Sequence, residues 1–259
     1  MALFNDGPIN RIEELALHDS SLMETSTIEG IDVAAKIANA QDAIGTEILT
    51  FLLDNKAVDP LFGDALSCRR RTLGMADVVV TAELKRWHAF QALHGVYQDA
   101  YGHQSNDRYK WKWQEYGTLA RTAKARCLDV GIGLAADPIP RAQAPIVTTV
   151  AGAGGVTSFY FAVALVNAAG QEGAASEVVM VNVAAAMQAQ VRLSAPAGDA
   201  RGWNVYAGSG PESLMRQNDE VLDVSASWTQ PGLPKTGGAP GVGQAATFYA
   251  VQNRVIRRG

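Results

Sequence analysis

Apolar residues recur at steps of three or four along the first half of the chain, which is the spacing of an amphipathic helix. The segment from Ser26 to about Leu53 has such a stripe. Ser26 and Glu29 fit a capping box, in which a hydroxyl and a carboxylate each accept a backbone N–H that the first turn leaves unpaired. The pattern predicts one long helix that starts at Ser26, with its stripe made by Val33, Ile37, Ala40, Ile44, Ile48 and Phe51.

The same periodicity predicts two more long helices and one short one. The first long helix covers about 76–101 and the second about 106–131, where Gly131 suits a helix C-terminus. The loop between them is short enough for an antiparallel pair. A short helix is expected around Ile9–His18. The stripe of the last long helix is formed by Tyr109, Trp113, Tyr116, Ala120, Ala123 and Cys127.

Helical periodicity ends near residue 135, where three prolines in twelve residues predict an extended connector. Short β-rich runs follow, separated by Gly, Pro, Asn and Ser clusters, as in an all-β sandwich. Alternation is clearest at Phe159, Phe161, Val163 and Leu165, which should line one buried face.

The expected fold class is therefore α+β with several domains. An antiparallel helical bundle comes first, followed by an all-β immunoglobulin-like sandwich and an extended C-terminal tail. The expected boundaries are 1–138 for the helical domain, 139–146 for a Pro-rich linker, 147–246 for the sandwich and 247–259 for the tail.

Composition and charge narrow the function classes. The 259 residues are 47% hydrophobic and 19% charged, which suits folded domains. Residues 1–144 carry 15 Lys and Arg against 19 Asp and Glu, and residues 145–259 carry 7 against 7, so bulk charge favours no nucleic-acid binder. No secretory signal pattern and no apolar run of about 20 residues is present, so synthesis in the cytoplasm and no membrane contact are expected.

No constellation in the sequence has the spacing of a catalytic or metal site. His88 and His94 do not face one another on a helix, and His103 lies at a predicted turn. Cys127 falls on the apolar stripe of its helix, where cysteine behaves as a small hydrophobic residue. We therefore expect neither an enzyme nor a cofactor or metal.

Aromatic and basic residues alternate at Tyr109, Lys110, Trp111, Lys112 and Trp113, a mixture that can stack on bases and hold phosphates. Successive helical residues point 100° apart, which disfavours a continuous stacking platform. Trp111, with Tyr109, is better explained as a subunit contact, because Trp and Tyr are enriched at interfaces. Nucleic-acid binding remains the alternative.

Two basic clusters are candidate contacts. Arg69, Arg70 and Arg71 form either a solvated loop or, repeated by symmetry, a contact with DNA phosphates that does not read sequence. At the C-terminus, apolar and basic residues mix in a way that suits strand addition to a neighbour's sheet edge. These C-terminal candidates for partner binding are Arg254, Val255, Ile256, Arg257 and Arg258.

Two resemblances follow from these runs. FYFAVALVNAAGQEGAASEVVMV and VRLSAPAGDARGWNVYAGSG resemble a fibronectin type III or related immunoglobulin-like module, over roughly residues 146–235. RYKWKWQEYGTLARTAKARCLDVGIGLAADPIP, a helix with a Gly-rich exit into a Pro-rich strand, resembles the head-to-tail adaptor proteins of tailed phages, over about residues 20–140.

The resemblance to phage adaptors implies a structural protein of the virion neck. It implies a homo-oligomeric, dodecameric ring below the portal protein that extends the DNA channel and docks a tail or head-completion protein. It also places residues 254–258 at the portal and allows non-specific contact with genome DNA. The alternative is a capsid or tail decoration or adhesion protein whose sandwich binds carbohydrate through aromatics exposed on one face, with Trp203, Tyr206 and Trp228 as candidates.

Overall fold

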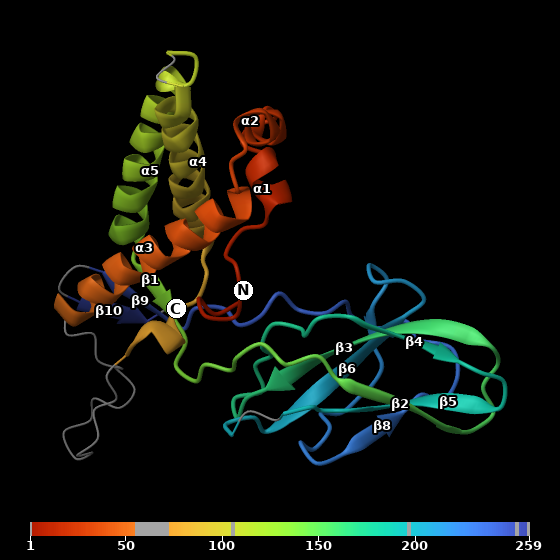
Figure 1. Cartoon of the computed structure of the whole chain (residues 1–259). Coiled ribbons are helices and arrows are strands. Elements are labelled where there is room, and N and C mark those ends of the chain that lie inside the picture. The colour runs from red at the N-terminus through yellow and green to blue at the C-terminus, as the bar shows by residue number, and fades with distance from the viewer. Residues whose placement is uncertain (1, 55–72, 105–106, 196–197, 252–253, 258–259) are drawn as a thin grey trace, which may run out of the picture. The chain divides into compact units, whose positions relative to one another are not determined.

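The chain is of mixed α+β structure and folds into two compact units, described here from a computed structural model (Figure 1). All residues are described except 1, 55–72, 105–106, 196–197, 252–253 and 258–259. The helical unit comprises residues 7–136 and 246–259, and the sheet unit comprises residues 1–6 and 137–245. The predicted α+β class is confirmed, because helices and antiparallel sheets are both present.

The helical unit is built around a pair of long antiparallel helices, α4 and α5, that lie side by side (Figure 1). The helix α3 packs across α4, and two short helices precede it. The helical elements are α1 (Ile12–Ala16), α2 (Leu22–Glu29), α3 (Val33–Asp54), a 3-10 turn η1 (Met75–Asp77), α4 (Ala82–Gln104) and α5 (Lys110–Val130).

The long helix predicted from Ser26 is wrong at its start, because the chain turns at Gly30. Gly30 has φ 64°, a left-handed conformation that glycine adopts without strain, and it ends α2. The Ile31 N–H donates to the Ser26 carbonyl across this turn, so Ser26 lies inside α2. Asp32 then caps α3, since its carboxylate accepts the N–H of Ala35 at 3.0 Å.

The helix predicted from Ala76 starts later, at Ala82. The preceding residues pair with β1 (Ile132–Leu134) instead: Val78 forms an antiparallel bridge with Leu134, and the Val79 N–H donates to the Gly133 carbonyl. β-branched residues favour such extended pairing. Thr81 then caps α4 by accepting the Leu84 N–H.

The segment predicted as an extended C-terminal tail instead forms a β-hairpin on the helical unit. β9 (Phe248–Val251) pairs antiparallel with both β1 and β10 (Arg254–Arg257), giving the order β1-β9-β10. Gly131, at the end of α5, has φ 103° and lies so close to Val251 that a Cβ would clash. That glycine lets the chain pass directly from α5 into this sheet.

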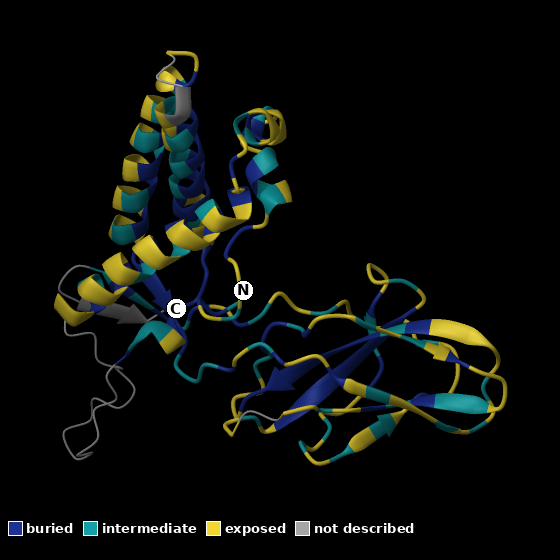
Figure 2. Cartoon of the chain, in the orientation of Figure 1, coloured by how far each residue is buried: buried dark blue, intermediate teal, exposed yellow. Residues whose placement is uncertain are grey.

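The sheet unit consists of two antiparallel sheets that share one apolar core, seen as dark blue strands in Figure 2. Phe159, Phe161, Val163 and Leu165 are all buried in this core, as the alternation predicts. The orders are β2-β5-β8 and β4-β3-β6-β7. The bounds are β2 (Ile146–Ala151), β3 (Thr157–Val166), β4 (Val179–Val183), β5 (Met187–Arg192), β6 (Gly202–Gly208), β7 (Met215–Arg216) and β8 (Ser227–Thr229).

The sheet unit is inserted between two neighbouring strands of the helical unit. The chain leaves the helical unit after β1 and returns to it at β9, where Leu134 and Phe248 are register partners. The Pro-rich segment between Asp137 and β2 contains neither helix nor strand, but it is packed: Ile139 and Ala142 are buried in the core of the sheet unit. The chain is therefore not a simple series of two domains and a tail.

Candidate functional site

Asp19, in the turn between α1 and α2, is the centre of a dense polar cluster in the helical unit. Its Oδ2 accepts the hydroxyl protons of Tyr97 at 2.6 Å and of Tyr116 at 3.0 Å. Lys112 Nζ donates to both carboxylate oxygens, at 2.9 and 2.8 Å, and Ser21 donates its N–H and its hydroxyl to Oδ1. The cluster joins the α1–α2 turn to α4 and α5.

These contacts determine the charge state of the cluster. Burial alone would raise the pKa of Asp19, but the hydrogen bonds from Lys112, Tyr97 and Ser21 outweigh it and hold that pKa at about 2. Burial alone would lower the pKa of Lys112, yet the bonds to Asp19 and Tyr97 raise it. The pair therefore stays ionised near neutral pH. Because the carboxylate is saturated with donors, it has no role as a general base, and the cluster is an internal clamp.

His88 on α4 forms a second buried polar contact in this unit. Its Nε2 lies 3.1 Å from the Ile37 carbonyl, which can only accept, so Nε2 donates. Its Nδ1 then accepts from the Asn10 side-chain amide at 2.9 Å. Burial lowers the pKa of His88, since the charged ring would lose its hydration. The neutral ring connects the N-terminal segment, α3 and α4.

The two aromatic residues predicted as subunit contacts lie in different environments. Trp111, in the first turn of α5, is 58% exposed. Tyr109 is buried, and its hydroxyl donates to Glu29 Oε1 at 3.0 Å. Only Trp111 is therefore available to a partner in the folded chain. Other large apolar side chains of the helical unit are exposed as well, among them Leu17, Met23 and Ile28.

The C-terminal candidates lie on the outermost strand of the small sheet. The backbone of Arg254, Val255, Ile256 and Arg257 forms β10, which pairs with β9 on one side. No further strand pairs with β10 among the residues that the structure describes. Arg258 and the loop candidates Arg69, Arg70 and Arg71 lie outside the described residues.

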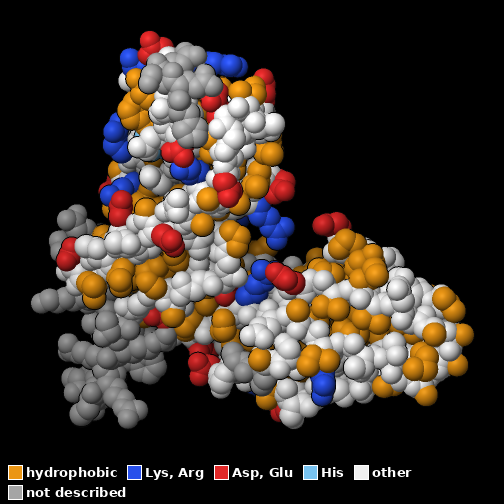
Figure 3. Space-filling view, in the orientation of Figure 1, with side chains coloured by type: hydrophobic (Ala, Val, Ile, Leu, Met, Phe, Trp, Pro, Cys, Tyr) orange, Lys and Arg blue, Asp and Glu red, His pale blue; other side chains and the backbone are white. Residues whose placement is uncertain are grey.

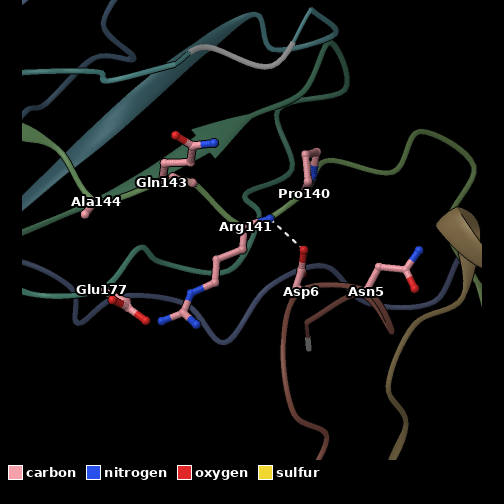
Figure 4. A pocket seen from close by; sticks show the side chains of 8 residues that line it. Asn5, Asp6, Pro140, Arg141, Gln143, Ala144 and Glu177 are labelled. Atoms are coloured by element: carbon pink, nitrogen blue, oxygen red, sulfur yellow. Dashed lines mark hydrogen bonds between the residues drawn. The ribbon is translucent and has the colours of Figure 1, made fainter. Parts of the chain in front are cut away.

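A shallow groove on the sheet unit surrounds Arg141 (Figure 4). The Arg141 N–H donates to Asp6 Oδ1 at 2.7 Å, and its Nε donates to the Ala175 carbonyl at 2.8 Å. The first of these bonds attaches Asp6, near the start of the chain, to the Pro-rich connector. The groove follows from that attachment. Its lining residues are Asn5, Asp6, Pro140, Arg141, Ala142, Gln143, Ala144 and Glu177.

The aromatics predicted to bind carbohydrate do not share an exposed face. Trp203 and Tyr206 are buried on opposite faces of β6, Trp203 in the main core and Tyr206 in a smaller cluster. The Trp203 Nε1 donates to the Asp223 carbonyl, and Trp228 packs edge-on against Phe161. The expectation is therefore wrong for Trp203 and Tyr206, because β6 is covered on both faces.

The structure also bears on a metal site, a reactive cysteine and a membrane-spanning helix. Among the described residues, no three His, Cys, Asp or Glu side chains gather as a metal site. Cys127 is fully buried, and burial raises the pKa of its thiol to about 12, so the reactive thiolate is disfavoured. Within the described part, no helix is both long and apolar enough to cross a membrane.

No protein-family model matches the chain, and no curated protein is significantly similar to it. The functional argument therefore rests on the residues and their geometry.

Proposed function

We propose that this protein is a virion structural subunit, a head-to-tail adaptor that forms a homo-oligomeric ring below the portal of a tailed phage. The ring extends the DNA channel and docks the next neck or tail protein. The sheet unit, two antiparallel sheets around a buried tryptophan, is proposed to be an immunoglobulin-like module inserted into the adaptor domain.

The observation that carries this proposal is the position of β10. A strand at a sheet edge offers a row of backbone donors and acceptors that a partner's strand can pair with. β10 is such an edge strand, and its sequence combines Val255 and Ile256 with flanking arginines. Partner docking at the C-terminus of phage adaptors is what the resemblance implies, and this strand is suited to that role.

The exposed Trp111 supports the ring itself. A tryptophan that is 58% exposed on a helix is a candidate interface anchor, because aromatic residues contribute most of the binding energy at many interfaces. We propose that it contacts the neighbouring subunit in the ring. Repeated interfaces of this kind provide the stability of a closed assembly.

A pair of proline variants tests the role of β10. In an edge strand, consecutive N–H groups point alternately to the neighbouring strand and outward. Of Val255→Pro and Ile256→Pro, one therefore removes an outward donor and the other removes a bond to β9. We expect the outward variant to retain its thermal stability but to lose co-purification with the portal protein of the same virus.

Immunogold labelling of virus particles provides the independent test. Antibody against this chain should label the junction of head and tail as a single cluster. Label scattered over the capsid or fibres, or a proline pair that binds portal like the wild type, would contradict the adaptor proposal.

A further inference from the structure

We infer that one flank of the sheet unit, formed by edge strands β2 and β4, is an interface between two copies of this chain. This interface is separate from the proposed ring contact and does not depend on it. The inference rests on how the two flanks of the sheet unit differ in strand length, coverage and charge.

Both sheets end on this flank in an edge strand that is paired on one side only within the described residues. β2 is the outer strand of β2-β5-β8, β4 is the outer strand of β4-β3-β6-β7, and the two strands lie against each other. Within the described residues, the backbone of β2 and of β4 forms hydrogen bonds only to its one neighbouring strand. The flank therefore presents two rows of free backbone donors and acceptors.

The opposite flank is protected in the way that natural sheets usually are. Its outer strands β7 and β8 are only two and three residues long. A loop also covers β7, because the Arg216 N–H donates to the Gly238 carbonyl at 2.8 Å. Short strands and covering loops are common ways to prevent edge-to-edge pairing.

The two flanks also differ in how many charged side chains they carry. Residues 142–191, which contain β2, β3, β4 and nearly all of β5, carry only Glu172 and Glu177 as charged side chains. The end of the sheet unit with β4 and β5 accordingly shows apolar and neutral polar side chains in Figure 3. By contrast, residues 192–245 carry nine charged side chains: Arg192, Asp199, Arg201, Glu212, Arg216, Asp219, Glu220, Asp223 and Lys235.

β4 lacks the charged residues and prolines that protect many edge strands. Its sequence VMVNV, preceded by Val178, contains no charged residue and no proline. Its outward side chain Met180 is 52% exposed, and Val178 is exposed as well. A regular, apolar, uncharged edge of this kind pairs readily with another strand. Its retention in a folded protein indicates that the edge is covered in the working state.

A second copy of the same flank is the occupant that fits best. Two antiparallel strands related by a two-fold axis can pair along identical edges, and an uncharged edge meets its own copy without repulsion. With the axis perpendicular to the sheets, β4 would pair with β4 while β2 approaches β2. Both free edges are then covered at once, which a single added peptide strand would not achieve.

The geometry makes a residue-level prediction for crosslinking. The residue on the two-fold axis faces its own copy, and the candidates at the centre of β4 are Met180 and Val181. In a Cys68→Ser background, either Met180→Cys or Val181→Cys should form an intermolecular disulfide under mild oxidation. Leu233→Cys, which is 85% exposed in the loop after β8, is the matched control and should not.

Sedimentation of the full chain over a concentration series gives the second test. We expect the wild type to associate, and the double variant Val178→Lys with Met180→Lys to weaken that association at least tenfold. Leu233→Lys should behave as the wild type, and circular dichroism should show all three folded. Equal sedimentation of all three chains with no crosslink at either β4 position overturns the inference. So does loss of binding to another virion protein as the only effect.

Discussion

The two units bury their polar side chains in different ways. The buried polar residues of the helical unit include ionisable groups, whereas those described in the sheet unit are neutral amides and one hydroxyl. The helical set is Asn10, Asp19, Thr25, Asp77, Thr81 and His88. The sheet set is Asn167, Ser176, Asn204, Gln217, Asn218, Gln230 and Gln244.

The neutral amides connect strands and loops as the charged cluster connects helices. Asn218 accepts the Val205 N–H and donates to Asn204, both at 2.9 Å. Gln244 accepts the Ile139 N–H and donates to the Asp137 carbonyl. Hydrogen bonds within each set thus connect segments of both units, but only the buried set of the helical unit includes ionisable side chains. We therefore expect a fall in pH to reduce the stability of the helical unit and to change the stability of the sheet unit much less.

The largest effect is expected from Trp203→Ala in the sheet unit. Removing a fully buried tryptophan from a packed core costs about 4 kcal/mol. Hydrogen exchange measured peptide by peptide should show loss of protection in residues 146–230 and little change in α4 and α5. The half-buried Trp228→Ala is the graded control and should cost less. Equal loss of protection in both units would show that they are not separate.

Asp19→Ala should have the next largest effect, confined to the helical unit. The substitution leaves Lys112, Tyr97 and Tyr116 without their shared acceptor, at a cost of about 3 kcal/mol. Asp42→Ala, at an exposed position of α3, is the matched control and should change stability by less than about 0.5 kcal/mol. Urea unfolding followed by helical circular dichroism measures both.

Acid provides a direct comparison of the units. The lowered pKa of His88 means that below about pH 6.5 the unfolded chain binds a proton that the folded helical unit does not. Stability of the helical unit should therefore fall as pH drops below that value. It should fall again between about pH 4 and pH 2, as Asp19 protonates.

Unfolding midpoints measured from pH 7 to pH 5 test the first step. His88→Gln should flatten the pH dependence of the helical unit, while His18→Gln, an exposed control, should leave it in place. The sheet unit should show no comparable change over this range. A parallel decline in both units would contradict the assignment to His88.

The smallest effect on stability is expected at Trp111. Truncating an exposed side chain with few contacts should change unfolding by less than about 0.5 kcal/mol. Its neighbour Trp113 stacks on Tyr101 at 5.4 Å, so Trp113→Ala should destabilise α5 clearly. If Trp111 is a ring contact, Trp111→Ala should weaken assembly, measured by light scattering, without altering the folded chain.

Local pattern was enough to predict the regular elements whose partners are near in sequence. Every buried residue of α5 lies on the predicted stripe, and the runs assigned to β3 and β6 are strands. The stripe of α5 reflects one buried face, which the side chains themselves specify. The predicted helix boundary was wrong at Gly30, because its left-handed backbone conformation ends α2 even though the apolar stripe continues.

Features that depend on distant partners could not be predicted in this way. Val78 and Val79 look helical until β1, more than fifty residues later, is available to pair with them. The hairpin β9–β10 closes on the same strand from the far end of the chain. The Asp19–Lys112 pair joins residues 93 positions apart, and nothing in the local sequence of either marks the other.

The insertion of the sheet unit between β1 and β9 has a mechanical consequence. Of the three covalent connections between the units, one joins Asp6 to Gly7, and the other two leave the helical unit next to the register partners Leu134 and Phe248. Tension carried by these last two connections would load the β1–β9 ladder from one end, so that its hydrogen bonds stretch in succession rather than together. Within the described residues β10 pairs only with β9, so a strand bound to β10 would transmit force to that ladder, and the small sheet would pass load between the two units.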